Sequence, residues 1–160
     1  MSGLALAALA FAGAPVQAAP VVHTQTPTGA IATAVEVPAG SDLIYLSGVL
    51  PPVINPSAPA GTAAAYGDTT TQAVNVFKII KAHLAEKGLG MGDVVMMRVY
   101  MVGDPTKDGH MDFAGMMAGY KQFFGTPEQP NKPSRSTVQV AGLAAAGPAM
   151  EIEVEAARAK

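Results

Sequence analysis

Alternating and continuous apolar runs predict strands near the N-terminal and C-terminal ends of the chain. Residues 31–37 and 43–47 are short apolar runs separated by Pro38, Gly40 and Ser41, which is typical of two strands joined by a tight connection. We therefore expect a hairpin at this point. The next segment, 51–67, contains four prolines and two glycines without any periodicity, and it is predicted to be a loop near the functional face.

Two later segments have the 3.6-residue period of amphipathic helices. In the first, Asp68 is placed to cap the N-terminus and Gly88 to end the helix. The second spans residues 112–124 and is followed by Gly125. The apolar positions that define the two stripes are Ala73, Val76, Phe77, Ile80 and Leu84 in the first helix, and Phe113, Met116, Met117, Tyr120 and Phe124 in the second.

Three further strands complete the pattern. Residues 94–102 are apolar at both alternating sets of positions except at Arg98, and residues 135–140 and 150–156 alternate. The expected fold is therefore α+β, in the order β-β-α-β-α-β-β, with both helices on one face of the sheet. Because the central strand is apolar on both faces, its second face needs a cover from outside the chain, and self-association supplies one.

The first 18 residues differ from the rest of the chain. They carry no ionisable side chain, have an apolar run from Leu4 to Ala12, and place Val16 and Ala18 at the positions of a small-residue cleavage site. We expect residues 1–18 to be a secretory signal peptide that directs the mature protein to the periplasm. A frayed, alanine-rich N-terminus is the alternative, and the protein would then remain in the cytoplasm. Mass spectrometry of the native protein decides between the two, since export predicts that the chain begins at Ala19.

Composition excludes several classes of function. The 160 residues include no cysteine, three histidines without metal-ligand spacing, and a formal net charge of −2. Disulfides, thiolate metal sites and cysteine nucleophiles are excluded, and there is no excess positive charge for a nucleic acid or a membrane surface. Residues 19–160 are long enough for a single domain that buries a substantial core.

Two charged side chains are the strongest candidates for a site. Arg135 stands where a proline-rich loop meets a strand, a position from which a guanidinium can hold a carboxylate through two hydrogen bonds, although a salt bridge is the simpler role. Three carboxylates, Glu151, Glu153 and Glu155, share one face of the last strand. Glu153 and Glu155 are expected to be solvated on an edge strand, whereas Glu151 is expected to lie at the end of a cleft. A second arginine, Arg98, lies in the middle of a predicted strand, and we expect it to pair with a strand carboxylate across an interface.

The chain resembles the Rid family, also called YjgF, whose older description is endoribonuclease L-PSP. The resemblance covers nearly all of residues 19–160, and its most specific part is PSRSTVQVAGL followed by EIE. The segments that carry it, in family order, are LSGVLP (46–51), DTTTQAVNVFKII (68–80), DVVMMRVYM (93–101), DFAGMMAGYKQFFG (112–125), PSRSTVQVAGL (133–143) and MEIEVEA (150–156).

This resemblance implies a chorismate-mutase-like fold assembled as a homotrimer with clefts between subunits. It implies hydrolysis of enamines and imines such as 2-aminoacrylate to a 2-keto acid and ammonia, without a metal or cofactor. The family's carboxylate-binding arginine falls on Arg135, its acidic residue on Glu151, and its Ser-Gly pair on Ser47 and Gly48.

The chain departs from the family pattern at two positions of the implied substrate site. Ile31 stands where the family has a tyrosine, and Met117 where it has an asparagine. Both replacements make the pocket more apolar, which favours larger hydrophobic imino acids, or binding without catalysis. An imine deaminase is therefore the leading hypothesis, a non-catalytic trimer that binds small carboxylates is the second, and a ribonuclease is the third.

Overall fold

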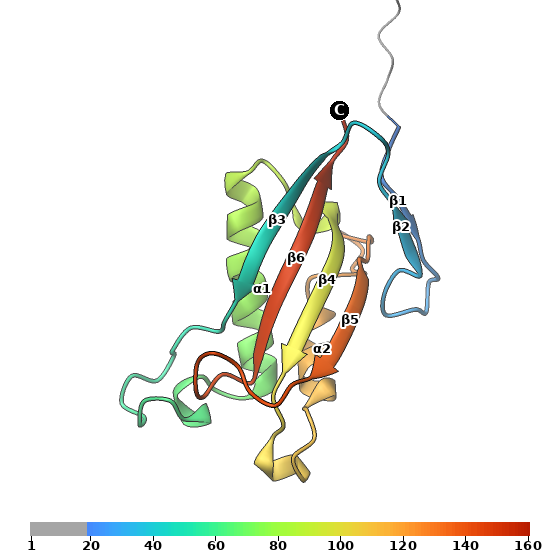
Figure 1. Cartoon of the computed structure of the whole chain (residues 1–160). Helices are drawn as coiled ribbons and strands as arrows, with labels where there is room; N and C mark the ends of the chain where they lie inside the picture. Colours follow the sequence, from blue (N-terminus) through green and yellow to red (C-terminus); the bar gives the residue numbers. More distant parts are fainter. Residues whose placement is uncertain (1–18) are drawn as a thin grey trace, which may run out of the picture.

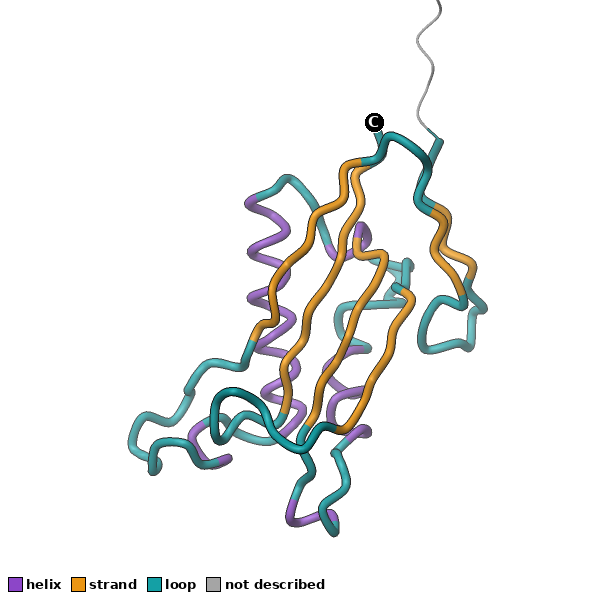
Figure 2. The backbone as a smooth tube through the Cα atoms, viewed as in Figure 1, coloured by secondary structure: helices purple, strands orange, loops and turns teal. Residues whose placement is uncertain are grey.

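A computed structural model describes residues 19–160 of the protein, and the predicted signal peptide, residues 1–18, lies outside the described residues. Four strands form a mixed sheet with both helices packed behind it, and a small two-stranded sheet lies beside one edge (Figures 1 and 2). The strands are β1 (Val22–Thr24), β2 (Ala34–Glu36), β3 (Asp42–Val49), β4 (Val94–Met101), β5 (Ser134–Gln139) and β6 (Met150–Arg158); the helices are α1 (Thr69–Glu86) and α2 (Phe113–Tyr120); three short 3-10 turns are η1 (Ala63–Ala65), η2 (Met91–Asp93) and η3 (Pro105–Lys107).

The helices begin and end largely where their local signals placed them. The Asp68 carboxylate accepts a hydrogen bond of 2.7 Å from the backbone N–H of Thr71, and Gly88 adopts a left-handed conformation just after α1, with φ of 68°. Helix α2 is shorter than predicted: it ends at Tyr120 and not at Phe124. Phe124 nevertheless stays in the core, stacked on Tyr120 with 4.8 Å between ring centroids.

The strand order of the main sheet is β3-β6-β4-β5. Strand β6 runs antiparallel to both of its neighbours, and β4 and β5 are parallel. The expectation of a solvated edge strand for β6 is therefore wrong: β6 lies in the interior of the sheet, and its alternate apolar residues Ile152 and Val154 are buried under the helices. As an inner strand, β6 pairs its backbone groups with β3 on one side and β4 on the other, which leaves no open edge along it.

The predicted hairpin between residues 31–37 and 43–47 is also wrong. Strand β2 pairs with β1, a strand that the apolar pattern did not indicate, and it does not pair with β3. The segment carrying β1 and β2 is attached to the start of β5, where the His23 imidazole lies 2.8 Å from the Lys132 carbonyl oxygen and the Ala32 N–H donates to the Pro133 carbonyl oxygen. Contacts with a segment a hundred residues away thus decide where this region lies.

The hydrophobic core lies between the sheet and the two helices. Met97, Val99 and Met101 of β4 point into it and are almost fully buried, together with Phe77 of α1 and Tyr120 of α2. We call this side of the sheet the helix face. A charged residue at Met97 or Val99 would therefore disrupt the core itself.

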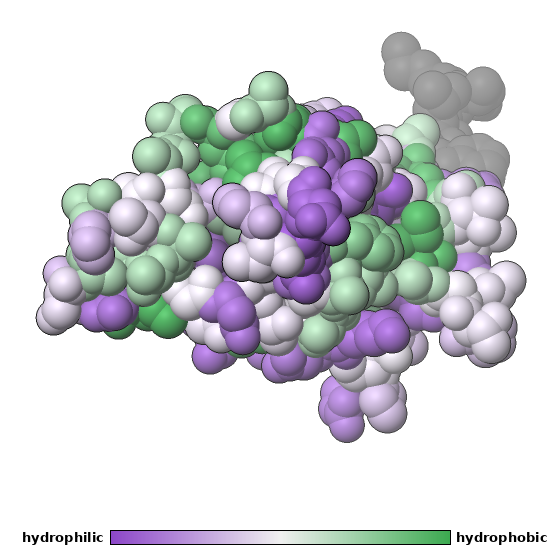
Figure 3. All heavy atoms as spheres, turned by 90° about the horizontal axis from the view of Figure 1, so that it is seen from below, coloured by the Kyte–Doolittle hydropathy of each residue, from purple (hydrophilic) through white to green (hydrophobic). Residues whose placement is uncertain are grey.

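The other side of the sheet, which we call the open face, has no helix over it among the described residues (Figure 1). Met96, Arg98 and Tyr100 of β4 lie there, and they are only partly buried. Leu43, Tyr45 and Val138 share this face and are among the exposed large apolar side chains of the described chain, with 47%, 66% and 46% exposure. The open face is therefore polar along its centre and apolar on either side. It is less apolar than expected from the sequence, which predicted a central strand that is apolar on both faces. At the lower end of the molecule, seen end-on in Figure 3, apolar and polar side chains are likewise mixed on the surface, which is a different part of the surface from the open face.

Candidate functional site

Arg135 lies on the helix face, at the beginning of β5. Its register partner in the parallel pair is the buried Met97, which places both side chains under α2. The guanidinium carbon lies 4.4 Å from the ring centroid of Tyr120 and 5.9 Å from that of Phe113. Two aromatic side chains of α2 thus contact the cation, at distances at which cation–π attraction stabilises it.

No carboxylate of the described residues pairs with Arg135, and its Nη1 is buried without a hydrogen-bond partner. Burial lowers the pKa of the Arg135 guanidinium, and burial raises the pKa of the Tyr120 phenol to about 12 against the opposing charge of Arg135. At neutral pH the site therefore holds a charged guanidinium beside a protonated phenol. A half-buried cation without an anion is the group that a ligand carboxylate would neutralise.

Two more buried polar atoms without partners occur next to this arginine. They are the Tyr120 hydroxyl on α2 and Thr137 Oγ1 on β5. Buried polar groups are usually hydrogen-bonded in folded proteins, so these atoms and Arg135 Nη1 together mark a polar site inside the fold. Neither residue is predicted to be functional from the sequence. The position of Thr137, two residues after Arg135 on the same face of the strand, is the signal that could have indicated it.

Ile31 and Met117 both lie on the Arg135 side of the molecule. Ile31 and Arg135 line one hollow of about 420 Å³ along the outer edge of β5. Met117 lines a second hollow together with Phe113 and Tyr120, the two aromatic residues that contact the guanidinium. We call Arg135, Tyr120, Thr137, Ile31 and Met117 the arginine half of the site.

Glu151, Ser47 and Gly48 lie together on the open face, near the end where β6 begins. The pairing of β3 with β6 shifts register between Leu46 and Val49, so Ser47 and Gly48 form a β-bulge. A Cβ atom at Gly48 would overlap the Glu151 carboxylate, so only glycine lets the side chain of Glu151 lie there. Ser47, Gly48 and Glu151 thus lie close together, and we call them the glutamate half.

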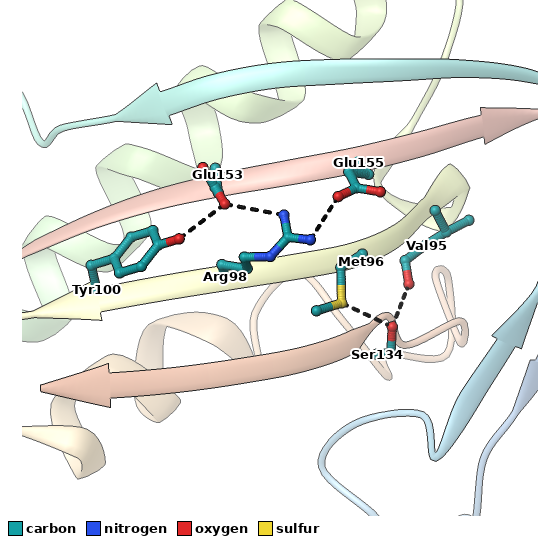
Figure 4. Close-up of polar contacts among 7 residues, drawn as sticks. All are labelled: Val95, Met96, Arg98, Tyr100, Ser134, Glu153 and Glu155. Carbon is teal, nitrogen blue, oxygen red and sulfur yellow. Dashed lines mark hydrogen bonds and ion pairs between the residues drawn. The ribbon is translucent and has the colours of Figure 1, made fainter.

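The other two carboxylates of β6 are held by an arginine of the same chain (Figure 4). Arg98 lies 3.1 Å from Glu153 and 2.9 Å from Glu155, and the Tyr100 hydroxyl donates to Glu153 over 3.0 Å. The expectation that Arg98 pairs across an interface is wrong, because register alone brings it between these two glutamates. Among the described residues, Glu151 is the only one of the three without an ion pair or hydrogen bond. It therefore remains free to act on a ligand.

The two halves lie on opposite faces of the sheet. Arg135 shares the side of Met97 under the helices, whereas Glu151 is opposite Tyr100 on the open face. Side chains of a strand alternate between faces, so one copy of the chain cannot bring both groups to the same small molecule. A small molecule in contact with both groups would therefore need Arg135 and Glu151 from two different copies of the chain.

Among residues 19–160, no three histidine, aspartate or glutamate side chains are grouped so that they could hold a metal ion. No helix in this part of the chain is long and apolar enough to cross a bilayer.

Comparison with protein families gives a match over residues 24–158 to the model described as Endoribonuclease L-PSP. A RutC family protein of Haemophilus influenzae is 33% identical over 123 residues, which cover 77% of this chain and 85% of that protein. TdcF of Escherichia coli, named a putative reactive intermediate deaminase, is 32% identical over 123 residues, which cover 77% of this chain and 85% of that protein.

Solved structures of the same group share the fold. The crystal structure of Escherichia coli TdcF with bound serine superposes with a TM-score of 0.55 at 32% identity, over 86% of this chain and 98% of TdcF. The Rid family protein YyfB of Yersinia pestis gives a TM-score of 0.61 at 22% identity, over 87% of this chain and 98% of YyfB. The expected α+β fold, with two helices on one face of the sheet, is confirmed.

Proposed function

Because the chain belongs to the endoribonuclease L-PSP family, also called the YjgF or Rid family, we propose that it hydrolyses 2-imino acids to 2-keto acids and ammonia. The observation that carries this proposal is the partly buried guanidinium of Arg135, which has no carboxylate partner among the described residues and one buried N–H group without an acceptor. Serine, the amino acid bound in the TdcF structure, carries the same 2-carboxylate as an imino acid.

The proposed reaction needs few groups. Arg135 binds the substrate carboxylate and fixes the imino carbon at a defined position. Glu151 takes a proton from a water molecule, whose oxygen adds to that carbon, and the proton moves to the nitrogen. The carboxylate of Glu151 then passes the proton of the new hydroxyl group to the nitrogen as the carbon–nitrogen bond breaks, so that ammonia leaves and the carbonyl of the 2-keto acid remains. Water is the only co-reactant, and this scheme uses no metal or cofactor.

The positions of Arg135 and Glu151 mean that the proposed reaction requires more than one copy of the chain. Because Arg135 and Glu151 lie on opposite faces of one sheet, the Glu151 that acts on a substrate comes from a neighbouring copy. We propose that the open face packs against other copies in a homotrimer, as the family resemblance implies. The exposed Tyr45, Leu43 and Val138 supply the apolar contacts for such an interface.

Light scattering on the purified protein, residues 19–160, is expected to give about three times the mass of one chain. The physical reason is the exposed apolar part of the open face, which is unfavourable in water. Tyr45→Asp should lower the measured mass, since it places a charge at the most exposed large apolar side chain of that face, whereas Val22→Asp on β1 should not. A monomer at micromolar concentration would contradict both the interface and the shared site.

Release of ammonia tests the activity itself. Imino acids generated in place from amino acids by an amino acid oxidase should lose ammonia faster with the protein present than without it. A rate equal to the spontaneous one for every imino acid tried would reject the deaminase.

A non-catalytic carboxylate-binding protein is the second candidate function. The observation that favours it is the apolar character of Ile31 and Met117, which gives the arginine half fewer groups to hydrogen-bond an imine nitrogen. Under this proposal 2-keto acids bind at Arg135 without any acceleration of hydrolysis. A ribonuclease would need a basic groove, and the composition, with twelve acidic against ten basic residues, argues against one. Salt-dependent binding of RNA would be the observation in its favour.

A further inference from the structure

A hollow of about 500 Å³ lies between the segment 27–30 and helix α2. Its walls include Pro27 and Ala30 on one side and Met117 and Phe124 on the other. The volume is within the range of small-molecule sites in proteins. No acidic side chain is among the residues that line it, and its apolar walls are interrupted by two lysines, Lys121 and Lys132.

Two aromatic residues connect this hollow to Arg135. Phe113 and Tyr120 line the hollow, and the same two rings contact the guanidinium at 5.9 Å and 4.4 Å. A ligand whose carboxylate is bound by Arg135 therefore has the hollow next to it. Phe113 is 43% exposed, so an apolar group entering here would cover an aromatic ring that water now contacts.

The wall formed by the segment 27–30 is held in place before any ligand arrives. The buried Lys132 ammonium donates to the carbonyl oxygens of Thr26 and Gly29, at 3.1 Å and 2.7 Å, and the Lys132 N–H donates to Gln25 Oε1. Gly125 permits this arrangement, because a Cβ there would lie 2.6 Å from Lys132 Cε. Since the Lys132 ammonium is already bonded to two backbone carbonyls, this wall of the hollow is preformed.

We propose that this hollow binds the substrate side chain, and that the protein acts preferentially on 2-imino acids with aromatic or large aliphatic side chains rather than on 2-aminoacrylate. The inference rests on the proposed function for the reaction, but its binding component is independent of catalysis. Aromatic stacking on the exposed ring of Phe113 and contact with the Met117 thioether supply the selectivity.

Binding of stable 2-keto acids by calorimetry separates the inference from the reaction. Wild type should bind phenylpyruvate on the order of tenfold more tightly than pyruvate or better, the discrimination expected of an apolar side-chain pocket. Met117→Trp, which fills the hollow, should reduce this ratio several-fold. Ala85→Trp adds the same indole to the exposed side of α1 and should leave the ratio as in wild type.

A second variant covers the case in which Met117→Trp fails to fold. Met117→Asn is smaller and polar, and it should also lower the phenylpyruvate preference, while circular dichroism checks the fold. Equal affinities of wild type for the two keto acids, or a ratio that neither Met117 variant changes, would overturn the inference. A preserved preference without any imine hydrolysis would instead reject the deaminase and retain the hollow as a binding site.

Discussion

Arg135→Ala is expected to abolish detectable acceleration of imino-acid hydrolysis while the protein remains folded. Loss of a charge-assisted, two-pronged contact to the substrate carboxylate should lower kcat/KM by roughly 30-fold to 1000-fold. Arg135→Lys should recover little of this, because an ammonium lacks the planar fork of the guanidinium. Ammonia release by wild type and both variants, measured side by side, checks the prediction.

The stability of the same variant gives an independent test. Arg135 stacks on Tyr120 but is partly buried without an anion among the described residues, so its removal loses a cation–π contact and also relieves a desolvation cost. These effects oppose one another, and the melting temperature should change by only about a few degrees. Arg158→Ala, at the exposed end of β6, is the matched control and should retain activity. A strongly destabilised Arg135→Ala with a normal specific rate would reduce the arginine to a structural role.

Glu151→Gln is expected to lower turnover by about 100-fold or more while substrate binding changes little. The amide keeps the shape of the side chain but cannot accept the proton of the attacking water, and general bases contribute on the order of 100-fold to 10,000-fold. Steady-state kinetics should therefore show a large fall in kcat with a nearly constant KM. Glu86→Gln, on the exposed surface of α1, is the control carboxylate.

Gly48→Ala tests whether the bulge acts through the glutamate. The added methyl group would occupy the space of the Glu151 carboxylate and displace it, so the variant should lose activity in the same way as Glu151→Gln. If the two residues act as a unit, the double variant should be no slower than Glu151→Gln alone. Additive losses would show that Gly48 has a separate role, and an active Gly48→Ala would contradict the placement of Glu151.

Much of the arginine half could be predicted from local sequence patterns. The 3.6-residue stripe of residues 112–124 places Met117 and Tyr120 on one face of α2, and strand alternation places Thr137 on the same face as Arg135. What could not be predicted is which face this is. The side of β5 that meets Tyr120 depends on packing between segments that are distant in sequence, and a one-residue change of register would reverse it.

The glutamate half also combines features that the sequence predicts with features that only the tertiary structure decides. Glu151, Glu153 and Glu155 are equivalent in sequence, since all three alternate with apolar residues on one strand. Tertiary structure distinguishes them, because Arg98 of β4 lies opposite the pair Glu153 and Glu155 and leaves Glu151 above Gly48. The sequence also did not reveal that β6 is an inner strand, because its alternating charges are typical of an edge.

The sequence by itself therefore determined the helices, most of the strands, the family resemblance and the residue types of the site. Each of these depends on interactions within a few positions along the chain or on short motifs. Tertiary structure alone decided that β2 joins β1, that β6 lies inside the sheet, and that Arg135 and Glu151 lie on opposite faces. The physical reason is that strand pairing and facing are set by contacts between residues far apart in sequence, which local patterns do not encode.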